Sequence, residues 1–279
     1  MKINIAQSAI AGYKTVWGER KYILKLVLIP ILIKFVCSMA VFILETDVFT
    51  LRFVLTMLPS YCADGWLVAH LLRLLLVGER FPMPRIENPS EDQVRAQKLR
   101  KRAISSAILY SMLIMMVQGG IAVGAPNLMD VLGIDPITQD WNPSIIVFAL
   151  YTVGFVAMIW SVRFIWLYIP LSINAPLKGF LQDIKGLITS YYIIGIWLLA
   201  VVPTLFITVL VPAMFMDPTY ETLYDVPTLY AFIIVLLRVV GELLSGVIVV
   251  TAITYAFKDI LKKYGAKLNF EHVTEDTAK

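Results

Sequence analysis

The chain has 279 residues, of which 59% are hydrophobic and only 16% are charged, and its mean hydropathy is +0.77. Soluble domains are about half apolar and a quarter charged, so this composition excludes an ordinary soluble protein and indicates a membrane protein. The net charge of +4 does not indicate nucleic-acid binding, because the basic residues gather at the ends of apolar stretches and not along one groove or helix stripe.

The residues before the first long apolar stretch have helical periodicity. Apolar side chains recur at three- and four-residue spacing, with polar residues elsewhere on the helical wheel, at Ile3, Ala6, Ile10, Tyr13 and Trp17. A helix with Trp and Tyr on its apolar face is typical of the lipid headgroup region. We therefore predict an N-terminal amphipathic interfacial helix that anchors the first span, with a partner-binding helix as the alternative.

Six apolar stretches are long enough to cross about 30 Å of hydrocarbon as helices. They cover residues 22–44, 49–77, 103–123, 144–169, 190–214 and 230–257. The sequence therefore predicts an all-α, polytopic membrane protein with six transmembrane helices. We expect one integral membrane domain over residues 1–265 and a polar, flexible cytoplasmic tail over residues 266–279.

The basic residues predict how the chain is threaded through the membrane. Of the 24 lysines and arginines, Lys34 and Arg238 lie at mid-depth in their spans, Arg52 alone lies at the outer side, and the other 21 lie on the inner side. The outer connections carry carboxylates, at Glu45, Asp47, Asp130, Asp135, Asp140, Asp217, Glu221 and Asp225. Because basic residues near span ends stay on the cytoplasmic side, we predict a bacterial cytoplasmic (inner) membrane protein with both termini cytoplasmic.

The connection between the second and third spans, residues 78–102, is rich in arginine and lysine. Ser90, followed by Glu91 and Asp92, predicts a capped helix start that leads into the third span. Basic residues beside a membrane attract anionic lipid at about 1 kcal/mol each. Membrane lipids, including anionic lipid at the cytoplasmic face, are therefore expected partners, although such clusters are also ordinary topology signals.

Charged residues inside spans are the best site candidates. Each costs at least ~2.5–3.5 kcal/mol in hydrocarbon, so Lys34, Asp64, Arg238 and Glu242 need partners or water. If the first two spans form an antiparallel hairpin, Asp64 lies within one turn of Lys34, and we predict that the two side chains pair. Arg238 and Glu242 are four residues apart and can meet on one helix face.

Arg163 completes the candidate site as a possible second partner of Glu242. It lies near the inner end of the fourth span, where its long side chain can also reach toward water. Two interpretations of the intramembrane charges are possible: they form structural ion pairs, or they form a functional polar site.

The residues that carry common enzyme chemistry are missing from the sequence. It has no GxGxxG, GxxxxGK[ST], HExxH, GxSxG or CxxC motif, and His70 and His272 are its only histidines. Cys37 and Cys62 are isolated inside spans, which favours neither a disulfide nor a metal site. We therefore expect no enzymatic activity, no metal site and no cofactor.

The segment 163–171, Arg-Phe-Ile-Trp-Leu-Tyr-Ile-Pro-Leu, is followed by an amphipathic connection over residues 176–189 and another span. This pattern resembles uncharacterised bacterial six-helix inner-membrane proteins and is similar to the membrane domain associated with some glycerophosphodiester phosphodiesterases. The chain has no room for the soluble phosphodiesterase domain, and the resemblance implies no catalytic residues.

Two functions fit these observations. The first is a non-enzymatic membrane protein that binds lipid or an unidentified membrane-protein partner in envelope organisation. The alternative is a small-solute or lipid transporter that uses the intramembrane charges. An enclosed polar cavity at these charges would favour transport, and a tightly packed ion pair would favour the first function.

Overall fold

The structure is a computed structural model of the chain. It describes residues 3–46, 50–82, 90–131, 145–205, 209–210, 213–214 and 227–267, without the side chains of residues 118–151. Every main secondary-structure element in these residues is helical. The helices are α1 (Ile5–Gly18), α2 (Arg20–Ile43), α3 (Leu51–Val77), α4 (Glu91–Val131), α5 (Ile145–Ile165), α6 (Tyr168–Leu171), α7 (Leu177–Asp183), α8 (Leu187–Leu205), α10 (Thr228–Ala256) and α11 (Lys258–Lys263).

Five candidate membrane spans are present in the described residues. They are α2, α3, residues 152–171 of α5 and α6, α8, and α10, all long and apolar enough to cross a bilayer. These coincide closely with five of the six stretches predicted from hydropathy. The remaining stretch, residues 103–123, lies inside the continuous 41-residue helix α4, and its last side chains are outside the described residues.

Local sequence signals explain where several helices begin and end. The Ser90 hydroxyl accepts a hydrogen bond from the Gln93 amide, and the Gln93 side chain accepts one from the Ser90 amide, which confirms the predicted capped start of α4. Gly78 ends α3 with a positive φ of 74°, a conformation that glycine adopts without steric cost. Its amide bonds to the Leu74 carbonyl, and the next amide bonds back to Arg73.

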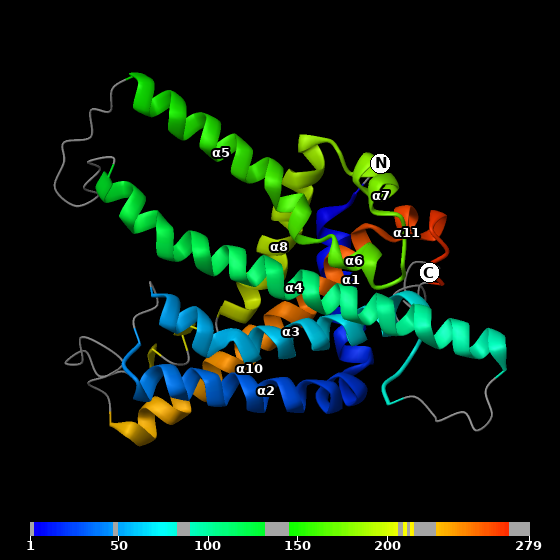
Figure 1. The fold of residues 1–279 in the computed structure, drawn as a ribbon, viewed down its shortest axis with the longest axis horizontal. Helices are drawn as coiled ribbons and strands as arrows, with labels where there is room; N and C mark the ends of the chain where they lie inside the picture. The colour runs from blue at the N-terminus through cyan, green and yellow to red at the C-terminus, as the bar shows by residue number, and fades with distance from the viewer. Residues whose placement is uncertain are drawn as a thin grey trace.

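The helices form a bundle (Figure 1), and α3 is the most buried of the five candidate membrane spans. It packs against α2, α4 and α10, and α10 in turn packs against α8. The side chains of Leu71, Leu72, Leu75 and Leu76 on α3 are almost completely buried. The short helices α6, α7 and α11 gather at one end of the bundle, where the first turns of α4 extend beyond the other helices (Figure 1).

The N-terminal helix α1 packs against the bundle through a face that periodicity did not predict. Small residues on this face, among them Ser8, Gly12 and Thr15, are buried against α8 and α10. A Cβ on Gly12 would lie only 2.8 Å from Ala252 Cβ, so the two helices approach as closely as small residues allow. The predicted apolar stripe is divided: Ile10 and Trp17 are exposed, whereas Ile3 and Tyr13 are partly buried against the bundle.

A long-range hydrogen bond also holds α1 in place. The Tyr13 hydroxyl donates to the Ala200 carbonyl of α8 at 2.7 Å. Burial raises the pKa of Tyr13, so the hydroxyl stays protonated as this bond requires. The helix is thus packed into the bundle, whereas its sequence predicted only an anchor at the membrane surface.

At the opposite end of the chain, the start of the predicted tail is joined to α3. The backbone amide of Lys267 donates to the Leu76 carbonyl at 2.8 Å. Residues 268–279, the rest of the predicted flexible tail, lie outside the described residues, as do the outer carboxylates Asp47, Asp135, Asp140, Asp217, Glu221 and Asp225.

Candidate functional site: a charged cluster in an apolar cavity

The ion pair predicted between the first two spans is present. Lys34 on α2 lies with its Nζ 3.0 Å from Asp64 Oδ2 on α3. Both side chains are well covered, with exposed fractions of 13% and 10%. The antiparallel packing of α2 against α3 brings them to the same depth, as the hairpin register predicted.

Lys34 has a second carboxylate partner, which the sequence reasoning missed. Glu242 on α10 places its Oε2 3.3 Å from Lys34 Nζ, so one ammonium group joins three helices. Glu242 also accepts a hydrogen bond from Arg238 Nε at 2.8 Å, which confirms that these two residues meet on one face of α10. The four side chains form a chain of alternating charge, in the order Asp64, Lys34, Glu242 and Arg238, with no net charge.

The depth of this charged cluster can be estimated from the helix boundaries. At about 1.5 Å per residue, the four residues lie roughly 14–21 Å along their helices from Ile43, Leu51 and Thr228, where the helices meet the predicted outer connections. This is near the middle of a hydrocarbon core about 30 Å thick. The similar depth of all four residues was visible in the sequence, but the contact between α2 and α10 was not.

The cluster lines a cavity of about 1120 Å³. The volume is at or slightly above the upper end of the usual range for small-molecule sites. Helices α2, α3, α4, α5, α6, α8 and α10 all contribute to its wall. Apart from the four charged residues, the wall is made mainly of apolar side chains, including Leu67, Val68, Ile114, Met115, Val162, Ile165, Trp166, Ile193, Trp197, Val201, Ile234 and Val250.

The two halves of the charged cluster differ in the exposed fraction of their side chains. Lys34 and Asp64 are almost covered, whereas the side chains of Arg238 and Glu242 are 67% and 37% exposed. All four residues line the cavity. The cluster therefore has a covered pair that joins α2 to α3 and an accessible pair on α10.

Arg163, the fifth predicted site residue, does not join this cluster. Its guanidinium is buried and donates to the carbonyls of Ile184 and Lys185, in the connection between α7 and α8. It also lies 4.1 Å from the ring centroid of Trp160. Of the two possibilities left open for Arg163, the pair with Glu242 is not formed, because the side chain instead satisfies backbone carbonyls close to its own end of α5.

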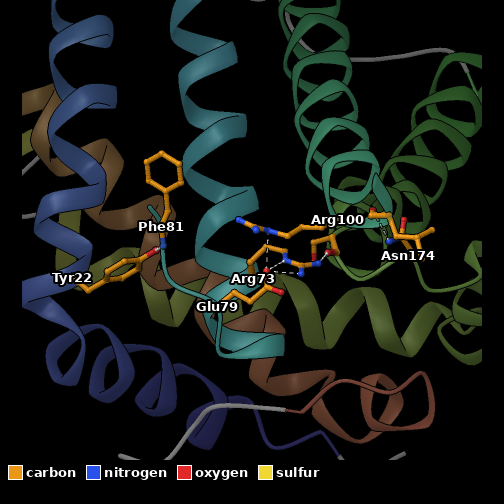
Figure 2. Close-up of polar contacts among 8 residues, drawn as sticks. Tyr22, Arg73, Glu79, Phe81, Arg100 and Asn174 are labelled. Atoms are coloured by element: carbon orange, nitrogen blue, oxygen red, sulfur yellow. Dashed lines mark hydrogen bonds and ion pairs between the residues drawn. The ribbon is translucent and has the colours of Figure 1, made fainter. Parts of the chain in front are cut away.

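A second polar network lies at the end of the bundle that contains α6 and α7 (Figure 2). Glu79 accepts a 2.8 Å hydrogen bond from Arg73 Nε and lies 3.2 Å from Arg100 Nε. Arg73 also donates to the Ser172 carbonyl at 3.0 Å. Because these contacts join the end of α3 to α4 and to the segment after α6, we assign the network a structural role.

The described residues offer no clear place for a metal ion. No three His, Cys, Asp or Glu side chains within the described part of the chain gather closely enough to hold one. Asp64 and Glu242, the two carboxylates in the cavity, are already bound to Lys34.

Comparison of the chain with protein-family models, with curated proteins and with solved structures finds no match. The resemblance to the phosphodiesterase-associated membrane domain therefore stays a prediction, and a function has to be argued from the cavity and its charges.

Proposed function

We propose that this protein is a non-enzymatic, multi-pass protein of the bacterial inner membrane that binds a lipid-like amphiphile inside its helical bundle. One observation carries the proposal: a cavity of about 1120 Å³ has a mainly apolar wall and a single group of charges at mid-depth. An amphiphile has the same two parts, because its chains avoid water and its head group needs ionic or hydrogen-bonding partners.

The proposal includes the topology predicted from the sequence. Helix α4 adds one span, residues 103–123, to the five candidate spans, which gives six in total. Both termini are cytoplasmic. Support comes from the fold, because α4 is continuous over 41 residues and its basic first turns lie at the same end of the bundle as α6, α7 and α11.

The cavity favours ligand binding over a purely structural role for the intramembrane charges. A structural pair needs only Lys34 and Asp64, which are covered and hold α2 to α3. If the accessible pair on α10 were also purely structural, it would not require a large cavity beside it. Arg238 is paired with Glu242, yet its side chain is two-thirds exposed at a depth where polar groups need partners, so a polar or charged ligand group would stabilise it.

Two glycines allow a matched test of the proposal. A Cβ on Gly246, which lines the cavity on α10, would have no atom within 4 Å, so Gly246→Phe puts a ring into the cavity without a clash at its base. Gly154 on α5 also has open space at its Cβ but does not line the cavity. Gly154→Phe is therefore the control.

The full chain and both variants are purified from membranes in mild detergent, and the lipid that stays bound is measured by mass spectrometry. We expect a defined lipid-like molecule in close to one copy per protein, retained by Gly154→Phe and lost from Gly246→Phe. If the unaltered protein carries no such molecule, or if Gly246→Phe keeps it in full, amphiphile binding in this cavity is refuted.

A further inference from the structure

The accessible pair on α10 is suited to one class of head group, and this inference rests on the proposed function. Arg238 uses only its Nε to bind Glu242 Oε1, at 2.8 Å. Its two Nη groups make no hydrogen bond or ion pair to the described residues, and they form the planar fork that binds phosphate with two parallel hydrogen bonds. Arg238 therefore offers a site for a phosphate group inside the cavity.

Glu242 lies one helical turn from Arg238 and offers the opposite charge. Its side chain is 37% exposed, so it is accessible to a ligand while it remains bound to Lys34 and Arg238. A positive ligand group beside Glu242 and a negative one beside Arg238 would place two ion pairs side by side in opposite directions. A phosphate and an ammonium that are joined by a short linker match this arrangement.

The charge balance of the cluster favours the same class of ligand. Lys34 and Arg238 neutralise Asp64 and Glu242, so the cluster carries no net charge before a ligand binds. An anionic head group would add an uncompensated charge at mid-depth, where charge is costly, whereas a zwitterionic head group would leave the site neutral.

We propose that Arg238 and Glu242 bind the head group of a zwitterionic phospholipid, with the phosphate on the Arg238 Nη groups and a primary ammonium on the Glu242 carboxylate. The apolar wall of the cavity, including Val201, Ile234 and Trp197, receives the acyl chains. A primary ammonium is favoured because it donates hydrogen bonds to a carboxylate, whereas a quaternary ammonium has no N–H to donate.

The test uses the purified full chain in mixed micelles that contain phosphatidylethanolamine and phosphatidylglycerol with identical acyl chains. Bound lipid is measured by mass spectrometry for the unaltered protein and for Arg238→Gln. Arg238 has Glu242 as its one ion-pair partner in the described residues, so its removal leaves the Lys34 bonds in place. The matched control is Arg52→Gln, which removes an exposed arginine from the start of α3, away from the cavity and from the basic connection of residues 78–102.

We expect the unaltered protein and Arg52→Gln to prefer phosphatidylethanolamine about tenfold or more, a free-energy difference of about 1.4 kcal/mol. Arg238→Gln should reduce this preference to within about twofold. Phosphatidylcholine should bind more weakly than phosphatidylethanolamine, and glycerophosphoethanolamine, which has no acyl chains, should not compete.

Equal binding of the two lipids by the unaltered protein would overturn the head-group inference, and so would an unchanged preference in Arg238→Gln. Effective competition by glycerophosphoethanolamine would instead identify a free polar ligand and would also overturn it. In these cases the lipid retained by Gly246→Phe still tests whether an amphiphile binds in the cavity, so the proposed function is decided separately from the head-group inference. Absence of any bound lipid from the unaltered protein would refute both.

Discussion

The bridging position of Lys34 leads to a quantitative prediction about the charged cluster. Lys34 binds two carboxylates, Asp64 and Glu242, whereas Lys34 is the one ion-pair partner of Asp64 among the residues that the structure describes. Lys34→Met therefore leaves Asp64 buried without a cation, and removal of one partner from a buried pair costs about 3–5 kcal/mol. Asp64→Asn leaves Lys34 bound to Glu242, so its cost is that of a lost charge-assisted hydrogen bond, about 1.5–3 kcal/mol.

The double variant Lys34→Met/Asp64→Leu should be more stable than Lys34→Met alone. It removes both covered charges, and Glu242 keeps Arg238 as its partner. Replacement of a whole buried pair by apolar side chains is often neutral or stabilising. The exposed Lys25→Met on the same helix is the control and should change stability by less than about 0.5 kcal/mol.

Thermal unfolding of the purified variants in one detergent, followed by tryptophan fluorescence, measures these effects. With about 2–4 °C per kcal/mol, Lys34→Met should lower the midpoint by at least about 6 °C, and Asp64→Asn should lower it less. The reasoning is refuted if Asp64→Asn is as destabilising as Lys34→Met, or if the double variant is less stable than Lys34→Met.

Three further predictions concern contacts outside the cavity, and the same unfolding assay checks them. Gly12→Leu should destabilise the protein by about 1–3 kcal/mol, because its Cβ would lie 2.8 Å from Ala252 Cβ. Gly154→Leu has open space at its Cβ and should leave the stability unchanged. Equal effects of the two changes would contradict the close approach of α1 and α10. Arg163→Met should lower the stability by about 2–4 kcal/mol, because it leaves backbone carbonyls without a donor and removes the contact with Trp160. A loss below about 0.5 kcal/mol would show that the Arg163 contacts are unimportant for stability. Glu79→Gln should cost about 1.5–3 kcal/mol through loss of the carboxylate shared by two arginines, and unchanged stability would contradict the structural role of that network.

The sequence predicted the parts of this fold that depend on spacing along one helix or across one hairpin. Hydropathy located the spans closely, the four-residue spacing predicted the contact between Arg238 and Glu242, and the hairpin register predicted the pairing of Lys34 with Asp64. In each case, helix geometry and a short connection limit which side chains can meet.

Contacts between helices distant in the chain were not predicted, because charge and hydropathy do not give the packing order of the bundle. The bridge from Lys34 to Glu242 requires α2 and α10 to be neighbours, and the cavity requires seven helices to be placed together. The partners of Arg163 were not predicted, because they are backbone carbonyls, which every sequence contains. The buried face of α1 did have a signal, since Ser8 and Gly12 form a small-xxx-small step, but the apolar stripe was more prominent.

The position of α1 has a consequence for biosynthesis. The hydrogen bond from Tyr13 to Ala200 spans 187 residues, so α1 is made long before the helix that receives it. At about 5–20 residues per second, the interval is roughly 10–40 s. During this time the face that contains Gly12 has no α10 to cover it, and the exposed side chains of Ile10 and Trp17 can keep the helix at the membrane surface. Insertion of α8 and α10 then completes the bundle, so assembly ends with the capture of one of the first helices to be synthesised.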